Sequence, residues 1–251
     1  MQTVIPNAVV DALLEARAVV VLTGAGVSAE SGIPTFRDAM EGLWAKYDPS
    51  RLATPEAFDR DPETVTRWYD WRREKCSRAK PNPEHLALAR LEKHLTTQQR
   101  GFSLLTQNVD RLHQAAGSRN VVELHGTLWV WRCTRCGVER EERAVPFTEY
   151  PPRCACGGAR RPGVVWFGEM LPEDALEKAL DALEASDLFF SVGTSAVVEP
   201  AASFIHRARR HGARTVEINR EPTPISPVVD WSLLGKAGEI LPELAQRSCG
   251  P

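Results

Sequence analysis

The amino-acid sequence predicts an α/β fold in which helices cover both faces of a doubly wound parallel sheet. Two observations lead to this prediction. Short apolar segments rich in β-branched residues alternate along the chain with helical segments, which is the pattern of buried parallel strands and crossover helices. Two longer stretches, residues 30–80 and 127–162, interrupt the alternation and predict a smaller second lobe formed by insertions.

The expected strands and helices follow from local sequence signals. The first strand covers 18–23, a buried apolar segment that stops at a glycine. Helices over 62–80 and 83–98 each begin at a proline, which is favoured in the first helical turn. We expect further strands at 102–106, 121–124, 164–167, 187–192 and 214–218, and further helices at 175–185, 201–211 and 240–246.

The composition is that of an ordinary globular chain, with 43% hydrophobic and 25% charged residues. A net charge of -2 argues against a protein that coats nucleic acid or anionic lipid through bulk charge. No apolar stretch approaches the length of about 18 residues that a membrane span needs, and the N-terminus lacks the pattern of a signal peptide. We therefore expect a cytoplasmic protein with reduced cysteines, no membrane association and no direct nucleic-acid partner.

Directly after the first strand, residues 24–29 (GAGVSA) fit the pattern G-x-G-x-x-G/A. Small residues let the backbone approach a pyrophosphate closely. A tight strand-to-helix turn without a ligand has the same pattern. A dinucleotide dehydrogenase carries an acidic residue about 20 positions further on, at the end of the next strand, but here that region, residues 36–47, has the pattern of a loop. The sequence therefore favours a nucleotide over a hydride-transfer site.

Polar side chains also follow two later strands. Gln107, Asn108 and Asp110 stand at the end of the second expected strand, where amide and carboxylate groups can bind a ribose and a carboxamide. Asn108 and Asp110 are equally good N-caps of a helix. His125 ends the third strand and precedes a glycine, which suits a general base near neutral pH, although a single histidine is more often structural.

Four of the six cysteines lie close together in the chain, as the pairs Cys133-Thr-Arg-Cys136 and Cys154-Ala-Cys156. Four thiolates satisfy a tetrahedral zinc ion and leave no open position for a catalytic water. The sequence therefore predicts one structural zinc ion and makes the smaller lobe a zinc-binding lobe. The second pair has one intervening residue where two are usual.

Within the helix expected at 62–80, Tyr69 and Arg72 are three residues apart and share one face. A tyrosine hydroxyl and an arginine guanidinium can together grip a carboxylate. From the residues alone, a packed tyrosine and a solvated arginine are the simpler interpretation.

Five segments occur in order along nearly the whole chain: 24–37, 106–113, 123–126, 162–169 and 193–195. Together they resemble the signature segments of the sirtuins, the NAD-dependent protein-lysine deacylases. The resemblance implies one sirtuin-type catalytic domain over 1–251. Its Rossmann-like large lobe would comprise about 1–35, 100–126 and 163–251, and its small lobe a helical part, about 36–99, and a zinc module, about 127–162.

The resemblance also implies roles for individual residues. His125 would be the catalytic base, and Asn108 and Arg37 would act at the reacting ribose. NAD, a consumed co-substrate, would contact Gly24, Ala25, Gly26, Ser28, Glu30, Pro34, Phe36, Arg37, Trp44, Gln107, Asn108, Val109, Asp110, Gly193, Thr194, Ser195, Asn219, Arg220, Glu221 and Ala237. An acyl-lysine protein or peptide would contact Tyr69, Arg72, Val165, Trp166, Phe167, Gly168 and Glu169, and zinc would bind Cys133, Cys136, Cys154 and Cys156.

A Tyr-x-x-Arg at the place of Tyr69 and Arg72 is similar to the class III, sirtuin-5-like branch, whose pair recognises the negative end of succinyl, malonyl or glutaryl groups on lysine. We therefore expect removal of succinyl, malonyl and acetyl groups, with nicotinamide and O-acyl-ADP-ribose as products. Two alternatives stay open within this resemblance: a sirtuin-fold protein ADP-ribosyltransferase, and a plain deacetylase without preference for acidic acyl groups. A dehydrogenase would leave the cysteines unexplained, and a zinc-ribbon binding module would leave His125 unexplained.

Overall fold

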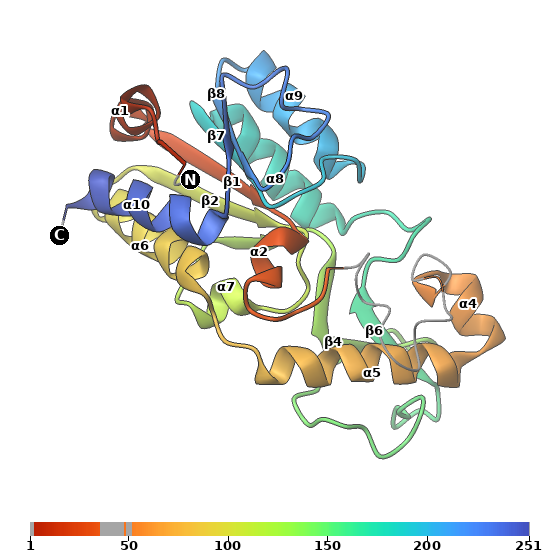
Figure 1. Ribbon diagram of the computed structural model, residues 1–251. Helices are drawn as coiled ribbons and strands as arrows, with labels where there is room; N and C mark the ends of the chain where they lie inside the picture. Colours follow the sequence, from red (N-terminus) through yellow and green to blue (C-terminus); the bar gives the residue numbers. More distant parts are fainter. Residues whose placement is uncertain (1–2, 36–47, 49–51, 251) are drawn as a thin grey trace.

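The computed structural model describes residues 3–35, 48 and 52–250 (Figure 1). Its large lobe contains a six-stranded sheet in the order β3-β2-β1-β7-β8-β9, in which every neighbouring pair is parallel. The chain fills one half of the sheet and then crosses to the other, so the strand order reverses between β1 and β7. The predicted doubly wound sheet is confirmed. The strands are β1 (Ala18–Thr23), β2 (Gly101–Thr106), β3 (Val121–Glu123), β7 (Leu188–Val192), β8 (Arg214–Asn219) and β9 (Trp231–Leu234).

Helices bury both faces of this sheet, which explains its continuous apolar strands. Val19 and Val21 of β1 face one hydrophobic core, and Val20 and Leu22 face the other, because successive strand residues point to opposite sides. The first core is closed by α1 (Asn7–Glu15), α6 (Pro83–Thr97) and α10 (Ala237–Cys249), and the second by α8 (Glu173–Ala185) and α9 (Phe204–Arg210) after a short 3-10 turn (Ala201–Ser203).

The small lobe combines a three-stranded antiparallel sheet, in the order β5-β4-β6, with two helices (Figure 1). Its core is aromatic: Trp68 of the long helix, Trp131 of the central strand and Trp166 after the last strand are nearly completely buried together. The elements are α4 (Pro55–Arg60), α5 (Pro62–Arg78), β4 (Gly126–Cys133), β5 (Glu139–Glu141) and β6 (Arg160–Val164).

Some elements differ from those expected. Helix α6 lies in the sequence range assigned to the small lobe, yet it packs Leu88, Leu91 and Leu95 into the core of the large lobe. The strand expected at 164–167 ends at Val164 as β6. The short elements α2 (Ala25–Ala29) and α7 (Leu112–Ala115) were not expected, because they are too short to show a hydrophobic period.

Within the described part of the chain, no helix has the length and apolar character needed to cross a membrane.

One buried ion pair fixes α5 to the cysteine-bearing part of the small lobe. Arg73 Nη1 donates to Asp70 Oδ1 at 2.7 Å, and the two side chains are only 0% and 3% exposed. Arg73 Nη2 also donates to two backbone carbonyls of segment 142–150, each at 2.8 Å. Asp70 Oδ2 in turn accepts from Phe147 N and Tyr150 Oη, each at 2.8 Å. The side chains of one helical turn therefore hold this segment in place.

Replacing this arginine tests that role. In Arg73→Met, the Asp70 carboxylate stays buried without a counter-charge, so we expect the free energy of unfolding to fall by about 3–5 kcal/mol. Urea denaturation followed by circular dichroism measures the change. The matched control is Arg78→Met on the same helix, whose ion pair with Glu74 is exposed and should change stability by less than about 0.5 kcal/mol. A loss in Arg73→Met no larger than in the control would contradict this role.

Candidate functional site

The turn after β1 lies against the end of β7. Gly24 N donates to Val192 O at 3.0 Å, and Gly26 N donates to Gly193 O at 2.8 Å. A Cβ atom on either Gly24 or Gly26 would lie 2.8 Å from Gly193 O, so only glycine fits at these positions without moving the backbone. The contacts place the predicted nucleotide turn at the strand-order reversal, which is where sheets of this kind bind nucleotides.

Two amide side chains predicted to bind NAD are held at the same edge of the sheet. Asn108 Nδ2 donates to Gly24 O at 2.9 Å, and Gln107 Nε2 donates to Thr194 Oγ1 at 3.1 Å. Beyond β7, Asn219 Nδ2 donates to Thr194 O at 3.3 Å. The contacts therefore bring together residues that are far apart in the sequence. Some follow β1, β2 and β7, and one lies at the end of β8.

The predicted ribose ligand Asp110 is 8% exposed, and burial raises the pKa of its carboxyl above the ordinary 3.8. Hydrogen bonds from Ser28 Oγ at 2.6 Å and from Leu112 N at 2.8 Å oppose that rise by stabilising the carboxylate. The positive charge of Arg72 opposes it as well.

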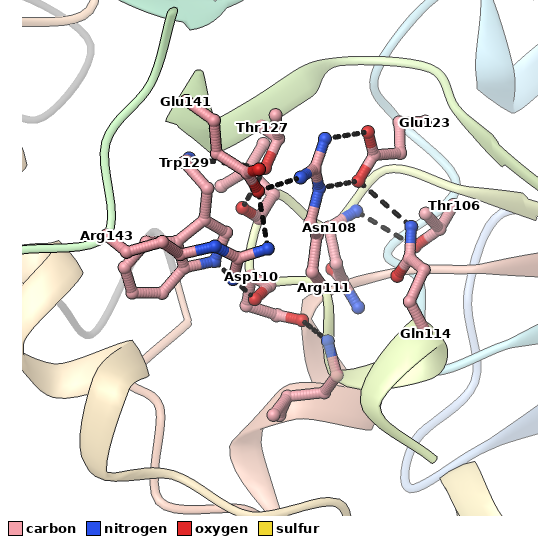
Figure 2. Close-up of polar contacts among 12 residues, drawn as sticks. Thr106, Asn108, Asp110, Arg111, Gln114, Glu123, Thr127, Trp129, Glu141 and Arg143 are labelled. Atoms are coloured by element: carbon pink, nitrogen blue, oxygen red, sulfur yellow. Dashed lines mark hydrogen bonds and ion pairs between the residues drawn. The ribbon is translucent and has the colours of Figure 1, made fainter. Parts of the chain in front are cut away.

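The loop that carries Asp110 is tied to the small sheet (Figure 2). Arg111 forms ion pairs with Glu123 of β3 and Glu141 of β5, each at 3.0 Å, and it has a positive φ of 67° that few non-glycine residues adopt. Trp129 Nε1 of β4 donates to Asp110 O at 2.8 Å. The sequence does not predict these contacts, because strands of both sheets, β3 of the large one and β4 and β5 of the small one, bring the partner groups to the loop.

The predicted base, His125, sits at the turn between β3 and β4, half-buried. Its Nδ1 lies 3.2 Å from Gln107 O. A carbonyl oxygen can only accept, so Nδ1 carries the hydrogen in this contact and the lone pair of Nε2 stays available for a proton. Burial lowers the pKa of the imidazole below its ordinary 6.5, and the bond to Gln107 opposes this shift. The ring is therefore neutral and basic near pH 7.

Tyr69 and Arg72 face the same region from α5. The Arg72 guanidinium carbon lies 5.6 Å from the centre of the Tyr69 ring, and Tyr69 Oη accepts a hydrogen bond from Trp166 Nε1 at 2.8 Å. Burial raises the pKa of Tyr69 to about 12, so its hydroxyl remains protonated. A protonated hydroxyl and a guanidinium are therefore carried by neighbouring side chains of one helix, and both groups can donate to a carboxylate.

Segment 165–169 connects these groups to the histidine. Val165 N donates to His125 O, and Phe167 N donates to Ala53 O, each at 2.9 Å. Phe167 is 48% exposed and Gly168 is exposed next to it. The segment is thus anchored through two backbone amides, while its Phe167–Gly168 turn faces outward. Its pairing with a substrate peptide as an added strand stays a prediction.

The residues predicted for the adenosine end of NAD lie around the end of β8. Arg220 Nη2 is 3.6 Å from Glu30 Oε1, and Ala237 is buried in the first turn of α10. Pro34 and Ser195 are half-buried and Glu221 is exposed. Phe36, Arg37 and Trp44 lie outside the described residues.

The four paired cysteines converge at one end of the small sheet. All four Sγ atoms lie within 4.8 Å of one another, and the shortest separation, between Cys133 and Cys156, is 3.5 Å. A tetrahedral zinc ion with Zn–S bonds of about 2.3 Å separates its sulfurs by about 3.8 Å. The donor set and its spacing therefore fit zinc, and the short Cys154-Ala-Cys156 spacing does not prevent this geometry. With four thiolates around it, the ion supplies no chemistry beyond holding the strands and turns together.

Comparisons with known proteins agree with this architecture. The chain is 50% identical over 236 residues to NAD-dependent protein deacylase 1 of Archaeoglobus fulgidus, covering 94% of each chain. It is 51% identical over 250 residues to NAD-dependent protein deacylase 1 of Pseudomonas aeruginosa, covering 96% of this chain and 98% of the relative.

Solved structures show the same fold. A Sir2 homologue in complex with NAD matches with a TM-score of 0.92 at 48% identity, covering 98% of this chain and 95% of that chain. A Sir2 protein in complex with an inhibitor, 2′-O-acetyl-ADP-ribose and a deacetylated p53 peptide matches with a TM-score of 0.84 at 33% identity, covering 96% and 98%. The family model described as Sir2 family matches residues 24–200. The chain belongs to the Sir2 family.

Proposed function

We propose that this chain is an NAD-dependent protein-lysine deacylase that removes succinyl and malonyl groups, and also acetyl groups, from lysine. Identity of about half the residues over nearly the whole length of curated NAD-dependent protein deacylases supports the deacylase activity. One observation carries the preference for acidic acyl groups. The guanidinium carbon of Arg72 lies 5.6 Å from the centre of the Tyr69 ring, and burial keeps the Tyr69 hydroxyl protonated by raising its pKa to about 12.

The chain's own side chains have separate tasks in this reaction. When bound, NAD supplies the ribose carbon that accepts the acyl oxygen, and nicotinamide leaves. Asn108, fixed by its bond to Gly24 O, orients the ribose and carboxamide. His125 Nε2 takes a proton from a ribose hydroxyl, and the Gln107 carbonyl keeps the Nδ1–H tautomer in place. The acyl group moves from the lysine nitrogen to the ribose and one water is consumed as the lysine amine leaves, so the products are lysine, nicotinamide and O-acyl-ADP-ribose.

The acid end of a succinyl or malonyl group would meet Arg72 and Tyr69. A charge-assisted hydrogen bond from the guanidinium, together with a neutral one from the hydroxyl, offsets the loss of water around the carboxylate. An acetyl group has no such carboxylate and gains nothing from the pair. Location in the cytoplasm and the absence of a nucleic-acid partner remain predictions.

Two alternatives share the same pocket. A plain deacetylase would show no benefit from the Tyr69 and Arg72 pair. A protein ADP-ribosyltransferase would release nicotinamide while the acyl group stayed on lysine, and ADP-ribose would be found on protein. Mass spectrometry of the products separates these reactions, because each leaves a different molecule bearing ADP-ribose.

The variant Arg72→Met tests the acidic-acyl preference. Loss of a hydrogen bond to a charged group is worth about 1.5–3 kcal/mol, so the ratio of kcat/KM for a succinyl-lysine peptide to that for an acetyl-lysine peptide should fall about 10- to 100-fold. Steady-state kinetics with saturating NAD give the ratio. The control Arg78→Met, at the exposed end of the same helix, should leave the ratio as in the unmodified protein. An equal loss for both peptides in Arg72→Met would remove the carboxylate-binding role.

The pH dependence tests the base. Because burial places the pKa of His125 below 6.5, the neutral imidazole is present above that pKa. We expect kcat/KM for the peptide to be constant near neutral pH and to fall only as the pH drops through a midpoint below 6.5. Kinetics between pH 5 and 8 measure this decrease in activity at low pH. If the residual activity of His125→Ala shows no such decrease, the titrating group is His125. A midpoint at or above 6.5 would contradict the neutral, buried imidazole.

A further inference from the structure

The hydroxyl of Tyr69 has only one of its two hydrogen-bonding roles filled within the described part of the chain. Trp166 Nε1 donates to Tyr69 Oη at 2.8 Å. An indole N–H is a donor and never an acceptor, so this contact uses a lone pair of the phenolic oxygen and leaves its hydrogen to point elsewhere. Tyr69 is 1% exposed, and burial keeps it protonated by raising its pKa to about 12.

The orientation of the Trp166 ring is itself fixed by a partly buried ion pair. The Arg161 guanidinium carbon lies 3.4 Å from the centre of the indole ring. Both terminal nitrogens of Arg161 donate to the Glu169 carboxylate, at 2.6 and 2.8 Å. Glu169 Oε2 also accepts from Trp166 N at 2.9 Å. The indole is therefore held through its face and its backbone, and its side-chain N–H is aimed at Tyr69.

The geometry points to a role for Trp166 as a positioning residue for acidic acyl groups. By occupying the acceptor side of the Tyr69 hydroxyl, its N–H leaves the O–H free to donate to the acyl carboxylate beside Arg72. The Arg161–Glu169 pair supports this by holding the indole. The inference rests on the proposed acidic-acyl preference, and it deepens that proposal by naming what directs the tyrosine hydroxyl.

A merely structural role for Trp166 would affect all substrates alike. The positioning role acts through one hydroxyl and matters only for a substrate that carries a carboxylate. The informative quantity is therefore the selectivity ratio, defined as kcat/KM for succinyl-lysine peptide divided by kcat/KM for acetyl-lysine peptide.

The experiment measures the selectivity ratio in Trp166→Phe, Tyr69→Phe and the double variant. Trp166→Phe keeps an aromatic ring and removes the N–H, so we expect the ratio to fall about threefold to tenfold, as for one hydrogen bond. In the Tyr69→Phe background no hydroxyl remains to be directed, and adding Trp166→Phe should leave the ratio as it is in Tyr69→Phe alone. Trp131→Phe is the matched control: it removes another buried indole N–H, whose partner is Leu128 O, and should not change the ratio.

Each outcome decides one question. The positioning role is supported if Trp166→Phe lowers the selectivity ratio of the unmodified protein but does not lower it further in the Tyr69→Phe background. An unchanged ratio in Trp166→Phe, with a lowered ratio in Arg72→Met, overturns the positioning role and keeps the acidic-acyl preference. An unchanged ratio in both variants removes the preference itself. A drop of the same size in both backgrounds shows that Trp166 acts by another route and also overturns the inference.

A second variant covers the case in which Trp166→Phe does not fold. Arg161→Lys keeps a cation beside Glu169 but removes the planar group from the face of the indole. The ratio should fall about twofold to threefold in this variant, and again only when Tyr69 is present. No change in a folded Arg161→Lys protein would overturn the supporting role of the ion pair.

Discussion

The close contact between two glycine turns at the strand-order reversal is the constraint on which the nucleotide site depends. Gly26 N donates to Gly193 O, and neither Gly24 nor Gly26 has space for a Cβ atom. The contact keeps the ends of β1 and β7 together, and Gly24 O then receives the amide of Asn108. The polar residues that follow β2 are therefore positioned against the same turn.

Helix α5 makes the corresponding connection in the small lobe, because neighbouring faces of one of its turns serve different partners. Asp70 and Arg73 hold segment 142–150, which leads toward the second cysteine pair. Tyr69 directly precedes Asp70, and Arg72 directly precedes Arg73. The Tyr69 hydroxyl accepts from Trp166, and the charge of Arg72 acts on the carboxyl of Asp110. The structural zinc site and the proposed acyl pocket are thus supported by one helix. Loss of the metal would accordingly disturb the pocket without any direct contact between them.

A second connection reaches the NAD loop from the small sheet. Trp129 donates to the carbonyl of Asp110, and Glu141 pairs with Arg111 (Figure 2). Such contacts connect the cysteine-bearing small sheet to the loop that carries Asn108 and Asp110. They also show why the two lobes act as one site: the loop with Asn108 and Asp110 is fixed on one side by the large sheet and on the other by the small one.

Much of this arrangement could be predicted, because parallel strands are apolar on both faces and the site residues follow directly after them. The glycine pattern, the strand-end polar residues and the cysteine pairs each give a local signal. The packing of α6 against the large lobe could not be predicted, since an amphipathic helix does not indicate which core it covers. The bond from Trp166 to Tyr69 and that from Trp129 to Asp110 depend on how distant segments pack, and no spacing in the sequence encodes them.

In the proposed function, the cofactor site and the Tyr69–Arg72 pair together remove acidic acyl groups from lysine. The most direct test incubates the protein with NAD and an equimolar mixture of succinyl- and acetyl-lysine peptides, and follows both peptides by mass spectrometry. Faster NAD-dependent loss of the succinyl group, with O-succinyl-ADP-ribose formed in equal amount, is the predicted result. Faster loss of acetyl would contradict the acidic-acyl preference, and loss of neither group while nicotinamide is released would contradict deacylation and favour ADP-ribosyl transfer.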